Sequence, residues 1–147
     1  DAMTTAAVVA YYRNEHEALV SYAVHPPVLY KRATDEMWSF ASPPDREIQS
    51  DCLPMNLPFD IFPDTEYKQF AIPLEPGDRL FVYTDGITEA KNKNNEEFGY
   101  ERLKHFLEKN AFYSAEYIKE EILKTLYEFC ESSNLDDDIT TLIIKVK

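Results

Sequence analysis

The sequence predicts an α+β domain, and three observations carry that prediction. Segments rich in β-branched and aromatic residues alternate with turn signals through the first half of the chain. Two segments with apolar residues at helical spacing follow, and one apolar strand ends the sequence. Strands and helices therefore come in blocks, which favours α+β over alternating β/α units, and the short-range spacing favours antiparallel pairing.

The first third of the chain is expected to form a meander of short strands. The candidate strands cover residues 4–12, 18–23, 28–31 and 37–40. Asn14 and Glu15 form the expected first turn. The adjacent Pro26 and Pro27 would break any helix between the second and third strands.

The middle of the chain is expected to hold a long connection and then two strands. Residues 42–63 are rich in proline, so no regular structure is expected there. A strand pattern returns at residues 67–73, and the Pro-Gly-Asp sequence at 76–78 signals a turn. Residues 79–84 form a strongly apolar strand that ends at Asp85 and Gly86.

Two helices are expected next, over residues 98–109 and from Ser114 to about Cys130. Their apolar positions at helical spacing are Phe98, Leu103, Phe106 and Leu107 in the first helix and Ile118, Ile122, Leu126 and Phe129 in the second. Ser114 is the expected N-cap of the second helix. Residues 132–138 form a polar loop, and residues 139–146 are nearly apolar throughout, which is typical of a central strand.

Composition excludes several classes of function. Lys and Arg number 15 while Asp and Glu number 27, so the formal net charge is −12. Such an excess argues against nucleic acid and against anionic lipid as partners. Hydrophobic residues make up 44% of the 147 residues, which is enough for the core of a single domain spanning 1–147. The longest apolar run, residues 6–12, is far shorter than the roughly 18 residues that a membrane span needs.

A cytoplasmic location is expected. No signal peptide is visible at the N-terminus. Cys52 and Cys130 lie far apart in the sequence and form no metal-binding or redox motif, so two reduced thiols are expected.

Two acidic points are candidates for metal binding because each lies at a strand boundary. Asp85 ends one apolar strand, and Asp136, Asp137 and Asp138 precede another. If the two strands are neighbours, the carboxylates converge at one edge of the sheet and repel each other unless a cation lies between them. Oxygen ligands favour Mg²⁺ or Mn²⁺ over zinc, and Gly86 would let a metal-bound water come close. The alternative is an ordinary Asp-Gly turn and an Asp-rich loop.

Several motifs occur in an order that resembles one known family. The sequence YTDG at 83–86 is followed by TEA at 88–90, FG at 98–99 and ERL at 101–103, and DDIT at 137–140 opens the last strand. AVHPP at 23–27 and LPFDIFPDTEY at 57–67 add two further matches. Together these closely resemble the bacterial SpoIIE/RsbU-type branch of the metal-dependent, type 2C protein phosphatases.

The resemblance implies a type 2C phosphatase-like β-sandwich with a flanking antiparallel helix pair, and two-metal hydrolysis of phosphoserine or phosphothreonine with Mn²⁺ or Mg²⁺. By resemblance, Asp85 and Asp137 are carboxylate ligands and Gly86 supplies a carbonyl ligand. Asp138 supports these ligands, and Asp136 is a surface residue. The implied substrate is a phosphorylated protein, such as an anti-anti-sigma factor in a partner-switching pathway.

The sequence also departs from the family pattern. The family's N-terminal metal element, an Asp followed by a G-H-G turn, is not present, so the chain resembles the C-terminal portion of a catalytic domain. With that ligand missing, we expect weak metal binding and little activity from this chain alone. Val24 and Asp60 replace two family glycines, which either strains the backbone or reshapes a loop.

Two other interpretations remain open: a catalytically inactive, phosphatase-like binding or scaffold module, and an acidic α+β interaction domain in which Asp85 and Asp137 lie far apart. An unpaired sheet edge or apolar face could also give a homodimer. His25 is interpreted as a turn residue rather than a proton donor, and Trp38 and Tyr83 as core residues. Residues 91–97 are interpreted as a solvated hairpin or loop rather than a calcium loop.

Overall fold

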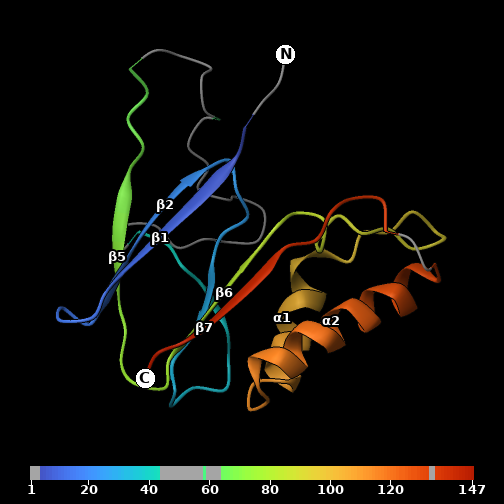
Figure 1. Ribbon diagram of the computed structural model, residues 1–147. Coiled ribbons are helices and arrows are strands. Elements are labelled where there is room, and N and C mark those ends of the chain that lie inside the picture. The colour runs from blue at the N-terminus through green and yellow to red at the C-terminus, as the bar shows by residue number, and fades with distance from the viewer. Residues whose placement is uncertain (1–3, 44–57, 59–63, 133–134) are drawn as a thin grey trace.

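The computed structural model describes residues 4–43, 58, 64–132 and 135–147. Within these ranges the chain forms two antiparallel β-sheets and a pair of helices, which confirms the predicted α+β class (Figure 1). Most of the proline-rich segment at 42–63, including Cys52 and Asp60, lies outside the described residues. No helix in the described ranges is long and apolar enough to cross a membrane.

Among the described residues, the first sheet has three strands in the order β1-β2-β5. They are β1 (Ala6–Tyr12), β2 (Glu17–Ala23) and β5 (Gln69–Pro73). β2 pairs antiparallel with both neighbours, so that Val20 lies opposite Val9 on one side and opposite Phe70 on the other. The alternation of buried and exposed positions in β5 is that of a strand with one face on the core.

In the part of the chain that the structure describes, the second sheet has four strands in the order β4-β3-β6-β7. They are β3 (Leu29–Lys31), β4 (Ser39–Phe40), β6 (Arg79–Tyr83) and β7 (Thr141–Lys145), and every pairing is antiparallel. β6 is central, and its side chains alternate between two cores: Leu80 faces the first sheet, whereas Phe81 and Tyr83 face the helices.

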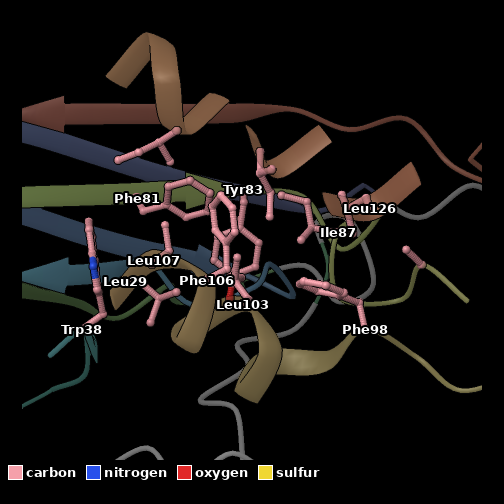
Figure 2. Packing of buried hydrophobic residues seen from close by; sticks show 13 residues of the cluster. Leu29, Trp38, Phe81, Tyr83, Ile87, Phe98, Leu103, Phe106, Leu107 and Leu126 are labelled. Carbon is pink, nitrogen blue, oxygen red and sulfur yellow. The ribbon is translucent and has the colours of Figure 1, made fainter. Parts of the chain in front are cut away.

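The two helices cover the outer face of the second sheet (Figure 1). α1 (Gly99–Lys109) and α2 (Ala115–Cys130) agree closely with the predicted ranges, and the Ser114 hydroxyl caps α2 by accepting from the Tyr117 amide. They run antiparallel, because Phe98 at the start of α1 packs edge-on against Phe129 near the end of α2. Figure 2 shows the aromatic and aliphatic side chains that fill this layer, among them Phe81, Tyr83, Leu103 and Leu126. Trp38 and Tyr83 are buried here, which confirms them as core residues.

The expectation that the last strand is central is wrong. β7 pairs with β6 and forms one edge of the four-stranded order among the described residues. Its apolar character comes from its two faces: Ile143 packs in the helix layer, whereas Ile144 packs between the sheets. Leu142 lies on the same face as Ile144 and is 53% exposed, so the burial of β7 on that face is partial. An apolar run therefore indicates that a strand packs on both of its faces. It does not indicate that the strand pairs with a neighbouring strand on both edges.

A buried carboxylate joins the turn before β6 to the end of β3. The Asp78 side chain is only 2% exposed and pairs with the Arg32 guanidinium at 2.8 Å. It also accepts from the backbone amides of Ala33 (2.8 Å) and Glu75 (2.9 Å). Burial alone would raise the pKa of Asp78, but these hydrogen bonds and the charge of Arg32 outweigh it and hold the pKa below its ordinary value. The sequence predicted only a turn here.

The connection from β2 to β3 shows the effect of a missing glycine. Val24 has φ 43°, a left-handed conformation that a β-branched residue rarely adopts. Of the two outcomes expected from the loss of a family glycine, a strained backbone or a reshaped loop, the structure shows the strained backbone at this position. The next residue, His25, places Nδ1 2.9 Å from the Pro26 carbonyl, as a turn histidine would.

Candidate metal centre

Asp85 and Gly86 lie in a tight turn just after β6. Backbone hydrogen bonds close the turn, from the Ile87 amide to the Thr84 carbonyl (3.3 Å) and from the Glu89 amide to the Asp85 carbonyl (2.8 Å). The Asp85 side chain is exposed, and its carboxylate has no hydrogen-bond or ion-pair partner among the described residues. The turn after β6 thus offers a carboxylate that is free to bind a cation.

Asp137 and Asp138 lie in the segment that leads into β7. Both are exposed, as is Asp136. The Asp138 amide donates to Asp137 Oδ1 at 2.8 Å, which orients the Asp137 carboxylate. Its second oxygen makes no hydrogen bond within the described part of the chain. This segment therefore offers a second oriented carboxylate to solvent.

The pairing of β6 with β7 brings the two acidic segments together. Thr84 makes three hydrogen bonds across the pair: its amide donates to the Thr140 carbonyl (3.1 Å), its hydroxyl donates to the Asp138 carbonyl (3.2 Å), and the same hydroxyl accepts from the Thr140 amide (3.0 Å). The predicted adjacency of the two strands is confirmed. It argues against an interaction domain in which Asp85 and Asp137 lie far apart.

Gly86 is buried at the point where the two segments touch. A Cβ atom on this residue would lie 2.7 Å from the Asp138 carbonyl oxygen, well inside van der Waals contact. Its φ is not positive, so the glycine is needed for close approach and not for an unusual backbone. The missing side chain thus leaves room for the Asp138 carbonyl, and the predicted approach of a metal-bound water to Gly86 stays a prediction.

The turn is also fixed to the start of α1. The Thr88 hydroxyl donates to the Asp85 carbonyl (3.2 Å), and the Gly99 amide donates to the Thr88 carbonyl (2.8 Å). Burial raises the pKa of Tyr100, and the negative charge of the nearby Asp85 raises it further, whereas the Thr88 side chain lowers it. Thr84 and Thr88 were not predicted as site residues, and only their hydrogen bonds in the structure reveal their part in this turn.

The donors at this end of the sheet suit a hard divalent cation. They are the carboxylates of Asp85 and Asp137 and the Gly86 carbonyl, which accepts no hydrogen bond from any described residue. Oxygen donors of this kind fit Mg²⁺ or Mn²⁺ and do not favour zinc. In the described ranges, no three His, Cys, Asp or Glu side chains are grouped so that they could hold a metal ion. A cation bound here would therefore keep about half of an octahedral coordination shell as water.

Comparisons with known proteins agree on one family. A family model described as Stage II sporulation protein E (SpoIIE) matches residues 1–147. The chain is 27% identical over 140 residues to the phosphoserine phosphatase RsbU of Bacillus subtilis, which covers 93% of this chain and 37% of that protein. It thus spans little more than a third of this curated relative.

Solved structures share the fold. The SiaA-PP2C domain of Pseudomonas aeruginosa superposes with a TM-score of 0.74 at 20% identity, over 97% of this chain and 52% of that one. The phosphatase domain of the cell-fate determinant SpoIIE from Bacillus subtilis gives a TM-score of 0.67 at 14% identity, over 97% and 56%. The predicted type 2C phosphatase-like fold is confirmed, and the chain corresponds to about half of each solved structure.

Proposed function

The chain belongs to the stage II sporulation protein E (SpoIIE) family, and from that premise we propose that it forms part of a metal-dependent phosphatase that removes phosphate from serine or threonine of a protein in bacterial signalling. One observation carries the proposal: the Asp85–Gly86 turn lies directly beside the Asp137–Asp138 segment. Hydrogen bonds of the Thr84 hydroxyl and the close approach of Gly86 to the Asp138 carbonyl hold the two together. Two exposed carboxylates at the end of one strand pair suit phosphate-ester hydrolysis assisted by hard cations.

In this proposal, the acidic residues and the glycine at this end of the sheet have different roles. Asp85 and Asp137 hold Mn²⁺ or Mg²⁺ through their carboxylates, and Gly86 contributes its carbonyl. Asp138 holds the loop through its backbone. When bound, the metal ions supply an activated water and neutralise charge on the phosphoryl group. Asp136, one residue before the ligand position, stays a surface residue.

The proposed substrate is a phosphorylated protein in a partner-switching pathway, of the anti-anti-sigma-factor type. Support comes from the family membership and from the relative named as a phosphoserine phosphatase. The net charge of −12 disfavours nucleic acid as the partner. A cytoplasmic location fits a substrate of this class. We also propose that two copies of the protein form a homodimer.

A second candidate is a phosphatase-like module that binds phosphoprotein without hydrolysing it. The observation in its favour is that no three metal-capable side chains are grouped within the described ranges. Under the leading proposal, the remaining ligand lies in another part of the full-length protein, and this chain alone hydrolyses little or nothing. Under the second candidate, no such ligand exists.

The two candidates are separated by assaying the full-length protein with a phosphoserine peptide. The leading proposal predicts phosphate release that depends on added Mn²⁺ and stops with EDTA, while a phosphotyrosine peptide is spared. Binding of the phosphoserine peptide without release, at any Mn²⁺ concentration, would favour the scaffold. Equal Mn²⁺-dependent release by the 147-residue chain alone would contradict the claim that its site is incomplete.

A further inference from the structure

Thr84 connects the two acidic segments through its side chain. Its hydroxyl oxygen donates to the Asp138 carbonyl at 3.2 Å and accepts from the Thr140 amide at 3.0 Å, across 54 and 56 residues of sequence. Both roles of the hydroxyl are therefore used, one as donor and one as acceptor. Valine has nearly the same shape but could fill neither role.

The contact lies where the Asp137–Asp138 segment has few other constraints. The side chains of Asp137 and Asp138 are exposed, and their one mutual hydrogen bond lies within the segment itself. On the β6 side, the segment is held by Thr84 and by the close approach of Gly86 to the Asp138 carbonyl. The Thr84 amide also donates to the Thr140 carbonyl (3.1 Å), but that bond is made by the backbone and any residue could make it. The Thr84 hydroxyl is thus the side-chain link that holds this loop beside the Asp85 turn.

We propose that Thr84 is a positioning residue, whose hydroxyl holds the Asp137 carboxylate at a fixed place relative to the Asp85 carboxylate. This inference rests on the proposed metal-binding function of those two residues. Groups that orient metal ligands without touching the metal typically change metal affinity by about 10- to 100-fold when they are removed. Loss of the hydroxyl leaves both carboxylates present but free to move apart.

The experiment compares Thr84→Val and Thr84→Ser with wild type in the full-length protein. Thr125→Val, the same chemical change on a half-buried position of α2, is the matched control. The first readout is hydrogen exchange of the Thr140 amide in metal-free protein, followed by NMR. The second is Mn²⁺ affinity measured by calorimetric titration with the metal alone.

We expect Thr84→Val to speed exchange of the Thr140 amide by about tenfold, because its acceptor is gone. Mn²⁺ affinity should fall by about tenfold or more. Thr84→Ser should keep both properties near wild type, and so should Thr125→Val. If Thr84→Val does not fold, Thr84→Ala makes the same test without a second methyl group beside the Asp138 carbonyl.

Three results would overturn the inference. Rapid exchange of the Thr140 amide in wild type would show that the hydrogen bond does not persist in solution. Equal Mn²⁺ affinity in wild type and Thr84→Val would show that the Thr84 hydroxyl does not position the Asp137 carboxylate for metal binding. That result would leave the proposed function standing. A wild-type protein that binds no Mn²⁺ would overturn the proposed function, and this inference with it.

Discussion

The Cα atom of Gly86 faces the carbonyl of Asp138 so closely that a Cβ atom would lie 2.7 Å from that oxygen. The oxygen belongs to the backbone, which cannot turn aside as a flexible side chain could. The contact joins the turn after β6 to the segment that precedes β7. The candidate metal ligands Asp85 and Asp137 are the residues just before Gly86 and Asp138.

Gly86→Ala should therefore separate the two acidic segments. We expect a loss of about 1–3 kcal/mol in the free energy of unfolding, which is the usual effect of forcing a methyl group into a packed contact. Mn²⁺-dependent hydrolysis by the full-length protein should fall by at least about tenfold. Thermal unfolding and p-nitrophenyl phosphate hydrolysis measure the two effects.

Gly99→Ala is the control for this change. Gly99 has φ 72°, but a Cβ atom there would meet nothing within 4 Å. This variant should lose about 1 kcal/mol through backbone strain alone and keep its activity per folded molecule. Equal losses of activity in both glycine variants would show that the contact with Asp138 is not what matters.

The Asp78–Arg32 pair should stabilise the fold in a pH-dependent way. Asp78→Ala leaves the guanidinium and two backbone amides without their partner, so we expect a loss of about 3 kcal/mol near neutral pH. Because the folded-state pKa of Asp78 is lowered, its contribution is present above the unfolded-state pKa of about 3.9. It is lost as the pH falls through the lowered folded-state value.

Urea unfolding between pH 7 and pH 2 measures this dependence. The difference between wild type and Asp78→Ala should shrink as the solution becomes more acidic. Asp35→Ala, which removes an exposed carboxylate near Arg32, should change little at any pH. A difference that stays constant down to pH 2 would contradict the ionic role of Asp78.

Val24→Gly should stabilise the protein. The positive φ of Val24 costs on the order of 1–3 kcal/mol, and glycine adopts this conformation freely. The gain is reduced by the larger backbone entropy of glycine in the unfolded chain, which leaves about 1 kcal/mol. Val24→Ala, which keeps a Cβ atom, should show no such gain. Equal unfolding free energies for Val24→Gly and wild type in urea would refute the strain at this position.

The periodic elements could be predicted because each depends on local sequence. Strand and helix limits agree with the structure to within about two residues, as in α2, where Ser114 and the apolar spacing define both the start and the buried face. The edge position of β7 could not be predicted, because burial on two faces and pairing on two edges give the same apolar run.

The candidate site was predictable at Asp85 and Asp137, because both lie at strand boundaries and match a family motif. Thr84 was not predictable as a link, since a threonine at the end of a strand is common and its partners lie more than 50 residues away. The burial of Asp78 and its pairing with Arg32 could not be predicted for a similar reason. A Pro-Gly-Asp turn has the same sequence whether its carboxylate is exposed or buried against an arginine.

The central claim is that the Asp85 carboxylate holds a catalytic metal ion, and the most direct test compares Asp85→Asn with Asp136→Asn in the full-length protein. Both changes remove one exposed carboxylate from this end of the sheet. We measure Mn²⁺-dependent p-nitrophenyl phosphate hydrolysis, and metal-free thermal unfolding as the control for folding. We predict that Asp85→Asn abolishes turnover while its unfolding temperature stays equal or rises slightly as carboxylate repulsion is relieved, and that Asp136→Asn keeps wild-type turnover. Full activity in Asp85→Asn, or equal loss in both variants, would contradict the claim.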